Sequence, residues 1–148
     1  MKRSIIYVVI VYILISFVTL LASYTASASD TITTQSGLKY VRLKEGNGIH
    51  PKSGQTAKVI YSRKSSTGRV VESNEGHAPF KFVIDAKEVI PGWDEAVKLM
   101  SKGEKGILIV PPSLAYKDKG VKDPNNEGVY IIPPNATLHF VIELVDFK

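Results

Sequence analysis

Apolar and polar residues alternate along much of the chain from residue 38 onward. The run 137–147 places Leu138, Phe140, Ile142 and Leu144 on one face and His139, Val141, Glu143 and Val145 on the other. This period of two is typical of a β-strand. Similar runs, separated by turns rich in Gly, Pro, Asn and Ser, predict further strands over residues 38–45, 57–63, 69–72, 80–84 and 106–110. The run 106–110 (GILIV) has the composition of a buried strand.

One segment breaks this period. In residues 91–100, the apolar side chains Trp93, Ala96, Val97 and Met100 recur at i, i+3, i+4 and i+7, which is the stripe of an amphipathic helix. Pro91 suits the start of that helix, and Gly103 suits its end. Such a stripe must be buried against one face of a sheet. The pattern therefore predicts an α+β fold with one short helix on an antiparallel sheet of five or six strands.

The N-terminal region reads as an export signal or a membrane anchor. A short basic segment, Met1–Ser4, precedes an uncharged apolar run over residues 5–22, and Ala26-Ser27-Ala28 has the form of a signal-peptidase site. The run is also long enough to span a bilayer if it is not cleaved. Both alternatives place the folded part outside the cytoplasm, in the periplasm or anchored to the inner membrane through residues 5–22. The expected organisation is residues 1–28 as signal peptide or anchor, 29–37 as flexible tether and 38–148 as folded domain.

Composition excludes several classes of chemistry. The 148 residues suffice for one ordinary domain. The chain has no cysteine, so thiol nucleophiles, thiolate zinc and disulfides are excluded. Its three histidines form no local ligand pair, and we expect neither a metal nor another cofactor. The net charge is +5, but the basic residues are scattered, so a nucleic-acid partner is not expected.

Four ordered segments resemble a known family. They are Ser36–Tyr40, Val89–Met100 with Gly103-Glu104-Lys105, Pro112–Tyr116 and Ile131–Leu144. Together they resemble the FKBP-type peptidyl-prolyl cis–trans isomerases, and the first segment resembles the lead-in of exported bacterial members. The resemblance covers about three quarters of the chain. It implies a sheet wrapped around the helix, with a ligand groove between them.

The resemblance also implies roles for individual residues. It places Trp93 on the groove floor, and it makes the Ile90 N–H and the Tyr116 hydroxyl donors to substrate carbonyls. The implied catalytic residues are Tyr61, Glu72 and Tyr116. The implied substrate-binding residues are Val71, Phe80, Val89, Ile90, Trp93, Ile132 and Phe140. Without the resemblance, the sequence favours ordinary core as the role of each apolar member of this set. The implied ligands are proline-containing polypeptides and macrolide-type inhibitors.

The chemistry of such a groove requires no covalent nucleophile. Rotation about an X–Pro bond is opposed by lost amide resonance, and an apolar pocket favours the twisted, less polar amide. Three positions depart from the family pattern: Val71-Glu72 replaces the usual Phe-Asp, and Lys117 replaces the usual Gly. We therefore expect an isomerase that assists the folding of exported proteins, with an activity that these three departures reduce. The alternatives are a weakly catalytic or non-catalytic module that binds proline segments at the membrane, and an assembly accessory anchored by residues 5–22.

Overall fold

The structure is a computed structural model that describes residues 31–65 and 68–148. The expected signal or anchor (residues 1–28) lies outside these ranges, as do two residues of the expected tether and residues 66–67, between the strands predicted over residues 57–63 and 69–72. In the part of the chain that is described, no helix is long and apolar enough to cross a membrane.

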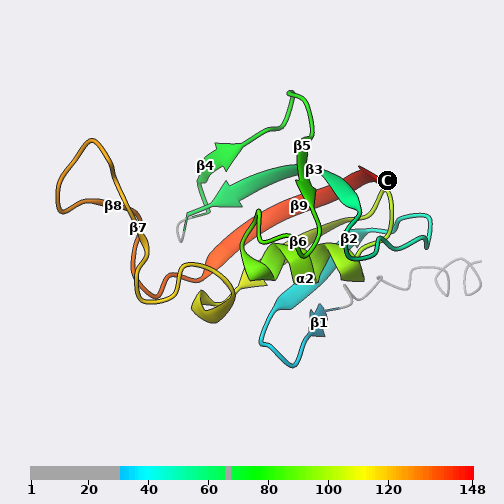
Figure 1. Ribbon diagram of the computed structural model, residues 1–148, viewed down its shortest axis with the longest axis horizontal. Helices are drawn as coiled ribbons and strands as arrows, with labels where there is room; N and C mark the ends of the chain where they lie inside the picture. Colours follow the sequence, from blue (N-terminus) through cyan, green and yellow to red (C-terminus); the bar gives the residue numbers. More distant parts are fainter. Residues whose placement is uncertain (1–30, 66–67) are drawn as a thin grey trace, which may run out of the picture.

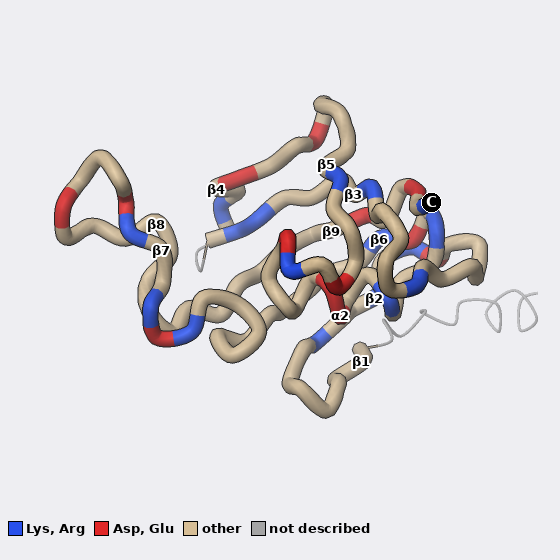
Figure 2. Tube along the Cα trace, viewed as in Figure 1, with Lys and Arg blue, Asp and Glu red and all other residues tan. Residues whose placement is uncertain are grey.

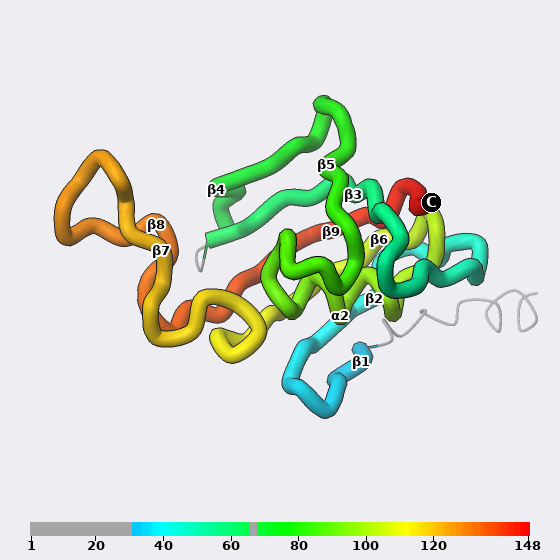
Figure 3. Tube along the Cα trace, viewed as in Figure 1, coloured from blue at the N-terminus to red at the C-terminus, as the bar shows by residue number. Residues whose placement is uncertain are grey.

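Seven strands form one antiparallel sheet (Figure 1). Its spatial order is β1-β2-β6-β9-β3, and the far edge of β3 pairs with both β4 and β5. The last strand in sequence, β9, therefore lies at the centre of the sheet, between β6 and β3 (Figure 3). The strands are β1 (Thr31–Thr33), β2 (Lys39–Lys44), β3 (Thr56–Lys64), β4 (Val70–Ser73), β5 (Phe80–Val83), β6 (Lys105–Val110) and β9 (Leu138–Phe147).

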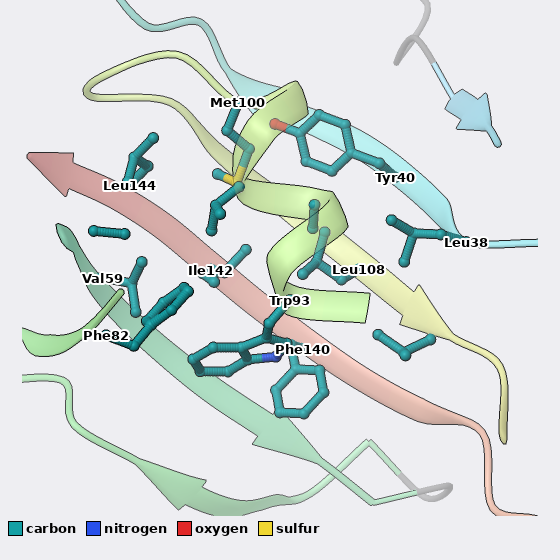
Figure 4. Packing of buried hydrophobic residues seen from close by; sticks show 14 of the residues in the cluster. Leu38, Tyr40, Val59, Phe82, Trp93, Met100, Leu108, Phe140, Ile142 and Leu144 are labelled. Atoms are coloured by element: carbon teal, nitrogen blue, oxygen red, sulfur yellow. The ribbon is translucent and has the colours of Figure 1, made fainter. Parts of the chain in front are cut away.

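One helix, α2 (Pro91–Leu99), covers the inner face of the sheet (Figure 4). Its buried residues include Trp93, Ala96 and Val97, as the apolar stripe predicted. They pack with the inward-facing side chains of the strands in one core cluster. Gly92 allows the close approach, because a Cβ there would lie 2.4 Å from a methyl carbon of Val110. The predicted fold class is therefore confirmed.

The two strands that share one edge of β3 are separated by a gap. Asn74 fills this gap with its side chain. Its Oδ1 accepts a hydrogen bond from the Tyr61 N–H at 2.7 Å, and its Nδ2 donates to the Val59 carbonyl at 3.1 Å. The amide thus replaces the missing strand partner, since unpaired backbone groups in a sheet are costly. This bond fixes the backbone at Tyr61, whose side chain enters the site described below.

A buried carboxylate sits at the opposite end of the core. Glu104 is 2% exposed, and its oxygens accept hydrogen bonds from Tyr40 at 2.5 Å, from Arg42 at 2.9 Å and from Ser101 at 2.8 and 2.9 Å. Burial alone would raise the pKa of the Glu104 carboxyl. The hydrogen bonds from Tyr40, Arg42 and Ser101 outweigh that effect and lower this pKa to about 2. Glu104 therefore stays ionised inside the fold.

The structure differs from the sequence-based expectation in three places. Residues 31–33 of the expected flexible tether form β1, which pairs with β2 and brings the sheet to seven strands. The long loop after Tyr116 contains a hairpin of β7 (Val121–Lys122) and β8 (Tyr130–Ile132), at the left of Figure 1. A 3-10 turn, η1 (Pro112–Leu114), follows β6. All four elements are two or three residues long, too short for periodicity to reveal.

Replacing Glu104 with Gln tests the buried cluster. Folding lowers the pKa of Glu104 from its usual 4.5 to about 2, so ionised Glu104 stabilises the folded state by about 3 kcal/mol at neutral pH. This contribution is fully present above the unfolded-state pKa and is lost as the pH falls from about 5 to about 2. Urea unfolding should show E104Q less stable than wild type at pH 7, with the difference vanishing near pH 2. A difference independent of pH would contradict this account.

Candidate active site

A cavity of about 190 Å³ opens between the N-terminal end of α2 and the inner face of the sheet. Strands β3 and β9 form its back, the loop before α2 forms one side, and Tyr116 and β8 form the other. Its lining residues are Tyr61, Arg63, Glu72, Phe80, Glu88, Val89, Ile90, Trp93, Tyr116, Ile132, Leu138 and Phe140.

The floor of the cavity is aromatic. The Trp93 indole is 5% exposed, and its ring centroid lies 4.8 Å from that of Tyr61 and 5.3 Å from that of Phe140, both in edge-to-face geometry. The ring centroid of Phe80 lies 6.1 Å from that of Trp93, also in edge-to-face geometry. Such contacts stabilise aromatic pairs beyond their burial and hold the rings in fixed orientations. The indole nitrogen has no hydrogen-bond partner among the described residues and lies on the side of Phe140 (Figure 4).

Three polar side chains at the mouth are paired with one another. The Tyr61 hydroxyl donates to Glu72 Oε1 at 2.7 Å, and Arg63 Nε donates to Glu72 Oε2 at 3.1 Å. Burial, followed by the hydrogen bond to Glu72, raises the pKa of Tyr61 to about 12. The phenol of Tyr61 therefore stays protonated at neutral pH. Its hydrogen bond to Glu72 holds the Tyr61 ring in its edge-to-face position beside Trp93.

Two donors at the cavity lack partners within residues 31–65 and 68–148. The Ile90 N–H, at the position before α2, makes no hydrogen bond there, and neither does the hydroxyl of Tyr116, which is 39% exposed. Tyr116 is held in place by its neighbour. Lys117 has a φ of 53°, its N–H donates to the Pro112 carbonyl, and its carbonyl accepts from Asn135 N–H. This left-handed conformation is the one that glycine adopts most readily, which explains why the family pattern has Gly there.

The structure brings together nine of the ten site residues inferred from the sequence. Val71 is the exception, since it does not line the cavity. It is 44% exposed and lies at the irregularity in the β3–β4 pairing, between Val70, which pairs with Lys64, and Glu72, which pairs with Arg63.

Three lining residues were missed. Arg63 and Leu138 lie two positions from Tyr61 and Phe140 on the same strands, so strand alternation could have identified them. No sequence signal marks Glu88. It reaches the cavity from a loop in which Asp85 and Lys87 have positive φ, and its carboxylate accepts from the Val83 N–H at 2.9 Å.

This arrangement can bind an apolar ring and orient carbonyl groups beside it. The floor is apolar, the two unpaired donors flank it, and the carboxylate at the mouth is already engaged. Among the described residues no group of three His, Asp or Glu side chains could hold a metal ion.

Comparison with known proteins agrees with this geometry. The family described as FKBP-type peptidyl-prolyl cis-trans isomerase matches residues 47–145. A probable FKBP-type peptidyl-prolyl cis-trans isomerase of Haemophilus influenzae is 39% identical over 82% of this chain and 47% of its own length. FkpA of Escherichia coli is 38% identical over 78% of this chain and 40% of its own length. Peptidyl-prolyl cis-trans isomerase Fkbp12 of Drosophila melanogaster is 40% identical over 74% of this chain and 96% of its own.

Solved structures give the same result. The crystal structure of AtFKBP13 superposes with a TM-score of 0.70 at 34% identity, covering 80% of this chain and 99% of that one. The structure of E. coli FkpA gives 0.66 at 35% identity, covering 86% of this chain and 55% of that one. The chain thus spans less than half of the length of the two bacterial relatives named above. It belongs to the family of FKBP-type peptidyl-prolyl cis–trans isomerases.

Proposed function

We propose that this chain catalyses cis–trans isomerisation of X–Pro bonds in exported polypeptides. The observation that carries the proposal is the pair of unpartnered donors, Ile90 N–H and the Tyr116 hydroxyl, on either side of a cavity floored by Trp93. Proline-containing segments are the substrates that suit this site, and macrolide-type molecules that fill the same cavity would inhibit it.

The proposed mechanism needs only binding. The planar X–Pro amide is separated from its isomer by a barrier of about 20 kcal/mol, because rotation removes the amide resonance. The twisted amide has less charge separation than the planar one, so it loses less solvation in a cavity built from Trp93 and Phe140. A thousandfold acceleration needs a preference of only about 4 kcal/mol for the twisted state.

The polar groups have separate parts in this mechanism. Tyr116 and the Ile90 N–H would each donate to a carbonyl that flanks the proline and hold the ends of the rotating bond. Glu72 acts as a positioning residue, because both of its oxygens are engaged by Tyr61 and Arg63. The proposal therefore includes no proton transfer.

A second candidate function is a binding module with little turnover. The observation that favours it is apolar surface beside the cavity, where Val71 is 44% exposed and Val129, Tyr130 and Ile131 are 50, 38 and 51% exposed. Such a rim suits an unfolded segment held on both sides of its proline. An isomerisation assay with a short X–Pro peptide separates the two functions, since only the enzyme accelerates exchange.

Replacing Tyr116 and Trp93 should affect different properties. Tyr116→Phe removes one unpartnered hydroxyl, so we expect kcat/KM on a short X–Pro peptide to fall about tenfold, with the urea midpoint unchanged. Trp93→Ala removes a buried ring, so we expect a loss of about 3–5 kcal/mol of folding stability as well as of activity. Wild-type turnover and peptide affinity in Tyr116→Phe would refute its assignment as a substrate donor.

Val71→Phe should raise activity. Val71 itself does not line the cavity, but it directly precedes the lining residue Glu72. A larger ring there would add about 50 Å² of apolar contact at the mouth of the cavity, equivalent to about 1 kcal/mol or a fivefold gain in rate. Leu43→Phe is the matched control, because Leu43 is 52% exposed and lies on β2, which neighbours neither β3 nor β4 in the sheet. NMR exchange measurements on a proline peptide should show a gain for the first variant alone. An equal gain in both would mean that contact at the mouth is irrelevant.

The proposed location outside the cytoplasm rests on residues 1–28 of the sequence. Protease added to spheroplasts is expected to digest the domain while a cytoplasmic marker protein survives. The mass of the purified protein then separates cleavage before Ser29 from retention of residues 5–22 as an anchor. Complete protection of the domain in intact spheroplasts, with digestion after lysis, would place it in the cytoplasm.

A further inference from the structure

The sheet has a second apolar face that the groove does not use. The run 106–110 has the composition of a buried strand, yet α2 covers only one side of β6. Leu108 and Val110 are buried towards the helix, whereas Ile107 and Ile109 point to the other side and are half-buried. We call this second side of the sheet the outer face.

Strand register joins the apolar residues of the outer face into one patch. Val41 pairs with Ile107, and Ile107 pairs with Val141, so these three residues form one row across neighbouring strands. Ile109 lies in the next row. Ile60 of β3, opposite Glu143, lies in the row on the other side of the row that contains Ile107. None of these side chains belongs to the core cluster or to the partly buried residues packed against it. The solvated face of an antiparallel sheet normally carries polar residues, so this patch is unusual.

Lysines flank the patch in the strand register, and Figure 2 shows basic segments on β3 and β5. The row of Ile109 has a lysine at each end. Lys39 pairs with Ile109, Ile109 pairs with His139, and His139 pairs with Lys64. Two further pairs of facing lysines lie on neighbouring rows: Lys44 with Lys105, and Lys58 with Lys81. The acidic residues paired with this face are Glu143, 3.7 Å from Lys44, and Asp146, 2.7 Å from Lys58. Six lysines thus face two carboxylates around an apolar centre.

We propose that the outer face docks on the surface of an anionic lipid bilayer. Lysines attract anionic headgroups, each contributing about fivefold to partitioning, and β-branched side chains can contact the apolar boundary below them. Nucleic acid fits this face less well, since single-stranded binding sites use aromatic side chains for stacking. The apolar patch described above contains only Val and Ile.

The path of the chain agrees with this orientation. Thr31 of β1 pairs with Val41, so the chain joins the sheet at the edge of the apolar row. Only residues 23–30 separate β1 from the apolar run 5–22, a span of at most about 28 Å. If that run is retained as an anchor, the outer face stays within reach of the bilayer. The cavity lies on the inner face beside α2 and would open away from the lipid.

Lysine footprinting of the full chain tests the proposal. The protein is reconstituted in vesicles of phosphatidylcholine, with or without phosphatidylglycerol, and acetylated briefly before mass spectrometry. We expect Lys39, Lys64 and Lys105 to be acetylated several-fold more slowly in anionic vesicles. High salt should remove this protection. Lys87 and Lys119, which lie in exposed loops outside the sheet, serve as internal controls with unchanged rates.

Matched variants separate docking from general charge effects. Replacing Lys39, Lys64 and Lys105 together with Gln should lower the ratio of docked to free domain about hundredfold, and protection at Lys58 and Lys81 should disappear. The same change at Lys87, Lys119 and Lys122 is the control and should leave protection intact. Isomerisation of a short X–Pro peptide should be equal in all variants, because none of these lysines lines the cavity.

Three results would overturn the proposal. The first is equal acetylation of the outer-face lysines in both vesicle types. The second is protection that follows protein concentration in the absence of lipid, which would assign the face to a second copy of the chain. The third is protection by an RNA or DNA oligomer but not by phosphatidylglycerol, which would assign it to nucleic acid.

Discussion

The packing of one helical stripe against one face of a sheet determines both the core and the site. Trp93, Ala96 and Val97 bury the stripe of α2, and Trp93 at its start also forms the floor of the cavity. The cavity persists because the aromatic rings of Tyr61, Trp93 and Phe140 meet edge to face instead of collapsing together. Stability and the proposed ligand binding therefore depend on the same side chain.

Hydrogen bonding decides which polar groups remain available to a ligand. Glu72 is engaged by Tyr61 and Arg63, and the backbone of Tyr61 is held by Asn74. The Ile90 N–H lies before the first residue of α2, where no intrahelical acceptor exists for it. Hydrogen bonds thus hold the side chains that shape the cavity, whereas the Ile90 N–H has no partner among the described residues and is free to donate to a carbonyl.

Much of the fold could be predicted from periodicity, because buried residues alternate strictly on β6 and on β9 from Leu138 to Leu144, and the helix has a full stripe. The elements that periodicity missed are two or three residues long, and β1 is a strand only through its pairing with β2. Nine of the ten inferred site residues line the cavity, and six of these nine lie within the family motifs. Val71 does not line the cavity, because an irregularity in the pairing of β4 moves it off the regular register.

By itself, the sequence determined the fold class, the helix, the family and most of the cavity lining, since these depend on local patterns and on motifs. Tertiary structure alone decided which polar groups are paired, that Glu88 lines the cavity, and that the helix covers only one of the two apolar faces of β6. These features depend on strand register and on loop conformation. A one-residue shift of register moves every side chain of a strand to the opposite face, and no local pattern in the chain specifies which strand lies beside it.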